Sequence, residues 1–188
     1  MYKKLSTRTA NRLLCGGQII NISSVSPDGV SDVMTAAWNC PYDADQVLIV
    51  LDRGHTTTAN ILDNGKFVIS IPSEDDIRTI NKVGSAHGRD VGDKFVWAGI
   101  ESDKSQILGL DVIPNALAYI ECELINRDVL DKTGVCLGKA VNIYVKDGLW
   151  DDEGSHFGEG MKLTLSYVHE GLYVKNLTWI MIGNVLNL

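Results

Sequence analysis

Short runs of alternating apolar and polar residues dominate the chain, separated by Gly, Asp and Asn. Such alternation predicts half-buried strands, because successive side chains of a strand point to opposite faces. The first run, residues 18–25, is closed by a Ser-Pro-Asp-Gly turn, and residues 34–40 follow as the expected hairpin partner. Residues 46–51 are apolar almost throughout, which predicts a strand that is buried on both faces.

Two early segments depart from this alternation and predict helices. The first covers residues 56–65, with a threonine as its cap and Asn64-Gly65 as its end. The second covers residues 73–83, with Ser73 as its cap and acidic residues in its first turn. Further strands are expected at residues 66–71, 116–126, 135–145, 162–167 and 172–174, with a polar turn at 131–134. Periodicity leaves residues 177–185 undecided.

This order of elements predicts the fold class. Many short strands with two early helices indicate a mainly β, barrel-like domain with helices packed outside. The chain shows no internal repeat and no Pro/Ser-rich linker, so we expect residues 1–188 to form a single domain. Strands and helices do not alternate, and no GxGxxG or Walker-type loop occurs, which argues against a Rossmann nucleotide site.

Composition narrows the possible functions. Lys and Arg total 17 and Asp and Glu total 24 in 188 residues, so the net charge is −7. With a sequence pI near 5.0, no general affinity for nucleic acid is expected. No apolar run is long enough for a membrane span, and no signal peptide is evident. The four cysteines are widely and irregularly spaced, which is typical of a reducing cytoplasm rather than of a disulfide framework or zinc site.

Familiar catalytic and metal motifs are missing from the sequence. The four histidines form no HExxH pattern, and no serine lies in a GxSxG elbow. We therefore interpret the histidines as loop residues and the cysteines as packed thiols. No metal ligand and no catalytic side chain is predicted.

Three segments could instead form a ligand pocket. In residues 52–61, Arg53 and three threonines lie at the start of a predicted helix. This arrangement predicts an anion pocket. Alternatively, a threonine only caps the helix and Arg53 is a solvated surface residue. Residues 84–95 are rich in glycine and predict either a loop that lets main chain approach a ligand, with Arg89 or Lys94 near a phosphate, or a flexible surface loop. Residues 34–39 could carry a flat ring on a strand of small residues, or simply form a hairpin strand with a core tryptophan.

The order of these segments resembles the flavin reductase-like family, which includes flavoredoxins. The resemblance runs from about residue 12 to 175 and is carried by Asp-Val-Met-Thr-Ala-Ala-Trp at 32–38, Arg53 with Thr57 and Asn60-Ile61, Gly-Lys-Phe-Val-Ile-Ser-Ile-Pro at 65–72 and the segment 88–95. The chain departs from the usual family pattern after Pro41 and at His87, where a serine is common.

The resemblance implies a six-stranded Greek-key FMN-binding split barrel with flanking helices, usually a homodimer. Residues 34–39 would lie along the isoalloxazine ring, and Arg53, Thr56 and Thr57 would hold the phosphate. The glycine-rich loop from Ser85 to Lys94 would close over the ribityl-phosphate side. The implied cofactor-binding residues are Met34, Thr35, Ala36, Ala37, Trp38, Asn39, Arg53, Thr56, Thr57, Asn60, Ser85, Gly88 and Lys94.

Two functions follow from this resemblance. The first is an FMN-binding oxidoreductase of the NAD(P)H:flavin reductase type, with NAD(P)H as a possible electron donor. The second is a flavoredoxin-type electron carrier that docks a redox partner protein and has no NAD(P)H turnover of its own. A third alternative is that the pocket holds another flat, phosphorylated ligand or stays empty. The sequence leaves open whether FMN is a prosthetic group or a substrate.

Overall fold

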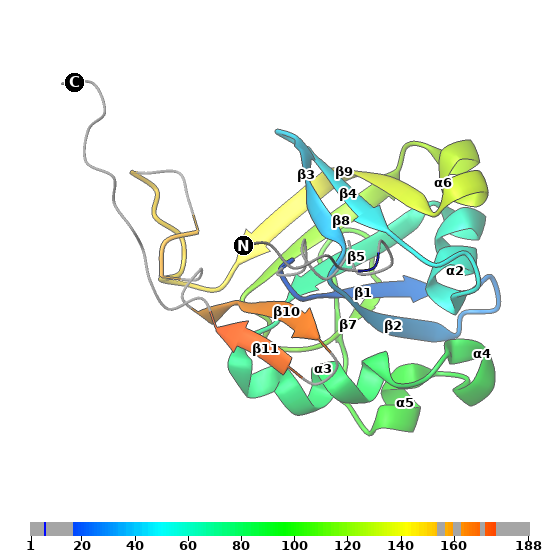
Figure 1. Ribbon diagram of the computed structural model, residues 1–188, viewed down its shortest axis with the longest axis horizontal. Coiled ribbons are helices and arrows are strands. Elements are labelled where there is room, and N and C mark those ends of the chain that lie inside the picture. Colours follow the sequence, from blue (N-terminus) through cyan, green and yellow to red (C-terminus); the bar gives the residue numbers. More distant parts are fainter. Residues whose placement is uncertain (1–5, 7–16, 154–156, 160–162, 170–171, 176–188) are drawn as a thin grey trace.

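A curled, seven-stranded antiparallel sheet forms the centre of the computed structural model, which describes residues 6, 17–153, 157–159, 163–169 and 172–175 (Figure 1). The strand order is β2-β1-β5-β8-β9-β4-β3. The strands are β1 (Ile20–Val25), β2 (Ser31–Ala36), β3 (Asn39–Asp43), β4 (Gln46–Val50), β5 (Lys66–Ile71), β8 (Ala118–Leu124) and β9 (Val135–Val145). The mainly β class is confirmed, with one strand more than the six that the resemblance implied.

The curl of the sheet follows from its connectivity. β2 and β3 are the two edge strands, yet only Ala37 and Trp38 separate them in the chain. The edges must therefore approach each other at this point, and the N–H of Val50 on β4 donates to the Trp38 carbonyl at 2.8 Å. The sequence predicted one strand over residues 34–40. The structure divides that segment between β2, which pairs with β1, and β3, which pairs with β4.

The strand that is buried on both faces is β5 and not β4. Residues 67–70 of β5 are all buried, because β5 lies between β1 and β8 and packs against core clusters on both sides. In β4 only Ile49 is fully buried, and Val50 is 37% exposed. The prediction that residues 46–51 are buried on both faces is therefore wrong. An apolar run also occurs where one face of a strand lines a cleft, as Val50 does here.

Helices cover one end of the sheet and the open edge of β2 (Figure 1). They are α2 (Thr56–Asn64), the 3-10 helix η2 (Glu74–Asp76), α3 (Ile77–Gly84), α4 (Gly88–Val91), α5 (Lys94–Ala98) and α6 (Arg127–Thr133). Both predicted helices are confirmed. Gly65 ends α2 in the left-handed region at φ 72°, and the Asp76 carboxylate accepts hydrogen bonds from the N–H and hydroxyl of Ser73.

Three details of the helix prediction are wrong. The residue before α2 is His55, not a threonine, and its side chain makes no capping bond. Residues 84–95 contain α4 and α5 rather than an open loop, with the Asp93 carboxylate capping α5 through the N–H groups of Phe95 and Val96. The polar turn at 131–134 is the end of α6. Helices α4, α5 and α6 span seven residues or fewer, which is too short for a 3.6-residue period to show.

Two small hairpins complete the described residues. β6 (Asp103–Lys104) pairs with β7 (Asp111–Val112), and β10 (Leu165–His169) pairs with β11 (Leu172–Lys175), which confirms the predicted C-terminal hairpin. Residue 162 and residues 177–185 lie outside the described residues. Ile19, Ile80 of α3 and Leu165 of β10 form one small core cluster beside β2. None of the described helices has the length and hydropathy needed to cross a bilayer.

Candidate functional site

A cleft runs along the open edge of β2, between this strand, the end of α3 and the starts of α2 and α4. Its wide compartment has a volume of about 600 Å³ and its narrow compartment about 110 Å³. Both compartments are lined by Met34, Thr35, His55, Gly84 and Ser85, so they adjoin. The wide volume falls within the roughly 300–1,000 Å³ that is usual for small-molecule sites.

The narrow compartment lies at the first turn of α2. The first intrahelical bond of α2 runs from the Ala59 N–H to the His55 carbonyl, so the N–H groups of Thr56 and Thr57 have no partner within the helix. The Thr56 hydroxyl accepts from the N–H of Arg89 at 2.9 Å and ties α4 to α2. Free N–H groups and the positive end of the helix dipole make this compartment suited to an anion.

Gly88 allows the close approach of α4 to α2. A Cβ atom at this position would lie 2.5 Å from Asp32 Oδ1 and 3.0 Å from Thr56 Cγ2. Real Cβ atoms essentially never lie 2.5 Å from another heavy atom, so a larger residue would force either Asp32 or the start of α4 to shift. Gly88 therefore sets the shape of the narrow compartment through its lack of a side chain.

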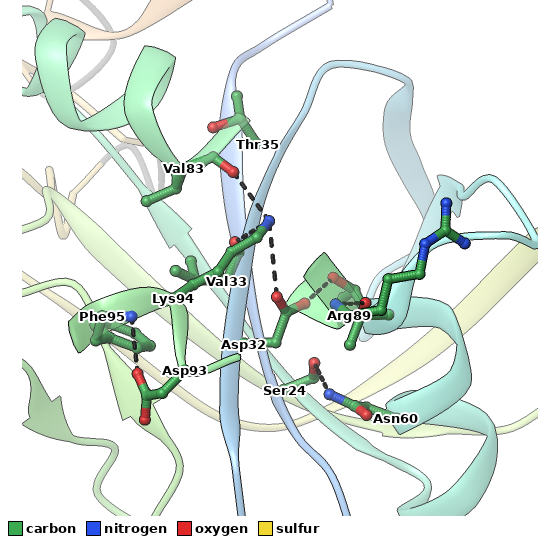
Figure 2. A network of polar contacts seen from close by, with 12 residues as sticks. Ser24, Asp32, Val33, Thr35, Asn60, Val83, Arg89, Asp93, Lys94 and Phe95 are labelled. Carbon is green, nitrogen blue, oxygen red and sulfur yellow. Dashed lines mark hydrogen bonds and ion pairs between the residues drawn. The ribbon is translucent and has the colours of Figure 1, made fainter. Parts of the chain in front are cut away.

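A buried ion pair forms the wall of the narrow compartment (Figure 2). Lys94 Nζ lies 3.6 Å from Asp32 Oδ1 and donates to the carbonyl oxygens of Val33 and Val83, each at 3.0 Å. The Thr57 hydroxyl donates to Asp32 Oδ2 at 2.5 Å. Burial lowers the pKa of Lys94, and the Asp32 carboxylate opposes that change. The pair neutralises its own charge, so the acid adds little net repulsion to the compartment.

Two histidines complete the narrow compartment. His55 and His87 each precede a helix, α2 and α4, and their ring centroids are 5.2 Å apart. Nδ1 of His55 is buried and has no hydrogen-bond partner among the described residues. Burial is the largest influence on His55 and lowers its pKa, while Asp52 acts in the opposite direction.

The wide compartment is more apolar and offers main-chain groups. The Val33 carbonyl accepts from Lys94 and so points away from β1. Because main-chain groups alternate along an antiparallel edge, the N–H and C=O of Thr35 also face the open edge. Trp38 is 54% exposed and lines this compartment together with Val50 and Ile80. A flat ring could lie here with its polar edge toward Thr35.

The structure brings ten of the thirteen predicted residues into the cleft. They are Met34, Thr35, Ala36, Ala37, Trp38, Thr56, Thr57, Ser85, Gly88 and Lys94. The other three lie outside its lining. Asn39 donates to the Gln18 carbonyl, Asn60 is buried and donates to the Ser24 hydroxyl, and Arg53 is exposed to solvent. Lys94 lines the cleft, but its ammonium is already bound to Asp32 and two carbonyls.

Sequence reasoning missed the two histidines and Asp32 as lining residues. The sequence predicts both histidines to be loop residues, since no motif links positions 55 and 87. A signal was present, because His55 adjoins the threonines of the predicted anion pocket and His87 lies in the glycine-rich segment. Asp32 opens the first matching motif, but its pairing with Lys94 depends on the fold.

Comparison with known proteins places this geometry in a family. The sequence matches the flavin reductase-like domain over residues 15–172. It is 36% identical over 170 residues to YddH of Escherichia coli K12, a protein described as uncharacterised, with 88% of this chain and 89% of that protein covered.

Solved structures agree at the level of the fold. An FMN-binding domain of a flavin reductase-like enzyme from Shewanella baltica superposes with a TM-score of 0.79 at 23% identity, covering 95% of this chain and 96% of the other. Flavoredoxin of Desulfovibrio vulgaris superposes with a TM-score of 0.81 at 20% identity, covering 98% of each chain. The split-barrel fold expected from the sequence is thereby confirmed, and the chain belongs to the flavin reductase-like family.

Proposed function

We propose that this protein binds FMN in the cleft beside β2 and acts as a flavin-dependent oxidoreductase of the NAD(P)H:flavin reductase type. The observation that carries the proposal is the pairing of two unlike compartments. A narrow polar compartment at the start of α2 adjoins a wide apolar one along a free strand edge. FMN has the same division, with a phosphate at one end and a flat tricyclic ring at the other.

The narrow compartment fits a phosphate. The N–H groups of Thr56 and Thr57 are unpaired within α2, and Nδ1 of His55 is a buried polar atom without a partner among the described residues. Gly88 keeps the approach clear of side-chain atoms. Anions bind at helix starts through such N–H groups, so we assign Thr56, Thr57 and Gly88 to the phosphate end.

The wide compartment fits the ring. We assign Met34, Thr35, Ala36, Ala37 and Trp38 to it, with Thr35 offering main-chain hydrogen bonds and Trp38 an aromatic face. Ser85 lines both compartments and is assigned to the ribityl chain between them. When bound, FMN would supply the hydride and electron-transfer chemistry, and the protein supplies position and polarity.

Loading and turnover test this proposal. Protein freed of flavin is titrated with FMN, and NAD(P)H oxidation is then followed with free flavin or ferric iron as acceptor. We expect saturable binding and flavin-dependent oxidation. Lys66→Gln, an exposed change at the start of β5, serves as a control that should bind FMN like the unaltered protein. Failure to bind FMN would refute the proposal, and binding without oxidation of NAD(P)H would refute its reductase part.

An electron-carrier role is the second candidate, favoured by the net charge of −7. An acidic surface suits docking to a basic redox partner protein. Stopped-flow reduction of the FMN-loaded protein separates the two functions. A reductase is reduced rapidly by NAD(P)H, whereas a carrier is reduced slowly by NAD(P)H and rapidly by a reduced partner protein.

A homodimer forms part of the proposal. Ile107, Val141 and Ile143 are 68%, 41% and 61% exposed, and the last two lie on one face of β9. Gln106, next to Ile107, accepts a hydrogen bond from Asn142, so Ile107 lies at the opposite face of β9, and Val141 and Ile143 form an exposed apolar pair of their own. A second copy could cover them. Sedimentation analysis of the protein and of Ile143→Asp should show a dimer and a monomer, respectively.

A further inference from the structure

The two histidines of the narrow compartment form a pair whose charge can follow that of its occupant. His55 and His87 both line the compartment, and their ring centroids are 5.2 Å apart with planes inclined at 46°. Neither side chain caps the helix that it precedes, so both rings remain available. Imidazole is the side chain whose ordinary titration lies nearest to neutral pH.

His55 carries the clearest sign of a missing contact. Its Nδ1 atom is buried and has no hydrogen-bond partner among the described residues. Leaving a buried polar atom unpaired costs free energy, and such atoms in folded proteins usually have a reason. An acceptor in the compartment would pair this atom once the ring nitrogen carries a proton.

The charged groups around the pair leave it without a fixed counter-ion. Asp32 on β2 already pairs with Lys94 of α5 and with Thr57. On α4, the Arg89 guanidinium donates to the Gly54 carbonyl and lies 3.8 Å from the Asp90 carboxylate.

Asp52, in the segment before α2, is exposed, and its Oδ1 accepts the Gly54 N–H. It acts to raise the pKa of His55, whereas burial, His87 and Lys94 lower it. The net effect is a lowered pKa, so burial favours the neutral His55 ring in the free protein.

A phosphate dianion would reverse this balance. It would bring two negative charges beside two imidazoles, and opposite charge within a few ångströms favours the protonated form of histidine. The N–H groups of Thr56 and Thr57 would bind the same anion from the helix side.

We propose that His55 and His87 form a proton-linked clamp for a phosphate dianion, an inference that rests on the proposed function. The pair takes up a proton from solvent onto a ring nitrogen when the phosphate of the ligand enters the narrow compartment. No covalent bond of the ligand forms or breaks. The clamp would distinguish FMN from riboflavin, which has the same ring and ribityl chain but no phosphate.

Calorimetry with FMN and riboflavin tests the clamp. Titrations at pH 7.5 in buffers of different ionisation enthalpy give the number of protons taken up on binding. A phosphate monoester has its second pKa near 6, so the phosphate itself contributes little at this pH. We expect uptake of about 0.5 to 1 proton with FMN and none with riboflavin, and an FMN dissociation constant that rises by up to about tenfold per pH unit above pH 7.

Variants assign the proton to the pair. His55→Asn/His87→Asn should lose proton uptake and bind FMN about 10- to 100-fold more weakly, with a much smaller loss of riboflavin affinity. His87→Asn, at an exposed position, should lose part of the uptake. Lys66→Gln is the control for a lost positive charge outside the cleft. Histidine nitrogen NMR provides a second readout, in which FMN should move the His55 signals toward those of an imidazolium.

The possible outcomes separate the clamp from the function. FMN binding without proton uptake, or with uptake that persists in the double variant, overturns the clamp and leaves the proposed function standing. Absence of FMN binding in the unaltered protein overturns both. Uptake that disappears in the variants while riboflavin binding remains supports both.

Discussion

The two ends of the cleft are built on opposite principles. Around the narrow end, fixed polar contacts hold the walls in place, through the Lys94–Asp32 pair, the Thr57 hydroxyl and the bond from Arg89 to Thr56, while Nδ1 of His55 stays without a partner among the described residues. The wide end is an open strand edge with a tryptophan that is 54% exposed. On the proposed function, the narrow end would be fixed in advance to hold the phosphate, and the wide end would stay accessible so that a second molecule can approach the ring.

The largest expected effect comes from breaking the buried pair at the narrow end. Lys94→Met would leave the Asp32 carboxylate, which is 2% exposed, without its counter-ion. Uncompensated buried charges cost ~3–5 kcal/mol, and we expect a loss of that order in the free energy of unfolding, measured by urea denaturation. Asp32→Asn/Lys94→Met should recover part of the loss. A double variant as unstable as the sum of the single variants would show that the two residues act independently.

Adding one methyl group at Gly88 should have the next largest effect. The new Cβ would meet Asp32 Oδ1 and Thr56 Cγ2, so either Asp32 or α4 must shift. Overpacking of this kind costs ~1–3 kcal/mol of stability, and FMN affinity should fall together with stability. Val96→Ala, at a position that is 80% exposed, is the control. Equal FMN affinity in Gly88→Ala and unaltered protein would mean that α4 does not shape the phosphate end.

The wide end should respond through affinity and not through stability. Trp38→Ala removes an exposed side chain, so the midpoint of thermal unfolding should hardly change. Loss of aromatic contact should weaken both FMN and riboflavin by ~0.5–1.5 kcal/mol, as measured by fluorescence titration. Because the phosphate end is untouched, the ratio of the two affinities should stay constant. A change in that ratio would contradict the assignment of the ring to the wide end and of the phosphate to the narrow end.

Acidification gives the smallest effect and tests the narrow end through the titration of His55. Burial lowers the pKa of His55 in the folded protein below the 6.5 of an unperturbed histidine. As pH falls below about 7, the unfolded chain therefore protonates this histidine before the folded protein does. The free energy of unfolding then decreases as pH is lowered, until the pH passes the pKa of His55 in the folded protein. Thermal melts of the FMN-free protein should show this slope, and His55→Asn should flatten it. An identical slope in the variant would assign the titration to another group.

The sequence predicted the parts of the site that are local in the chain. The Met34–Trp38 strand, the threonines at the start of α2 and Gly88 all belong to short motifs, and the structure brings them together. Local pattern could not show that Arg53 points to solvent although it adjoins the same motif. Whether a side chain beside a turn faces the cleft depends on how the turn packs, which the residue types do not specify.

The sequence predicted the fold less well where the structure depends on short helices or on contacts between residues far apart in the chain. α4 and α5 were expected as a loop, because four or five residues cannot show a helical period. The Asp32–Lys94 pair joins residues 62 positions apart, and the facing of His55 and His87 requires two helix starts to converge. Such contacts arise from tertiary packing, so no local signal marks them.

The two edge strands of the sheet, β2 and β3, are protected from pairing with other molecules in different ways. This protection matters at high protein concentration. β2 is flanked by α3 and α5, and Lys94 occupies the outward carbonyl of Val33. β3 carries Pro41, which has no N–H to offer, and its pairing with β4 is irregular between Pro41 and Asp43. Neither edge strand can recruit a strand from another molecule along its full length, so the curled sheet can stay open for a ligand without polymerising.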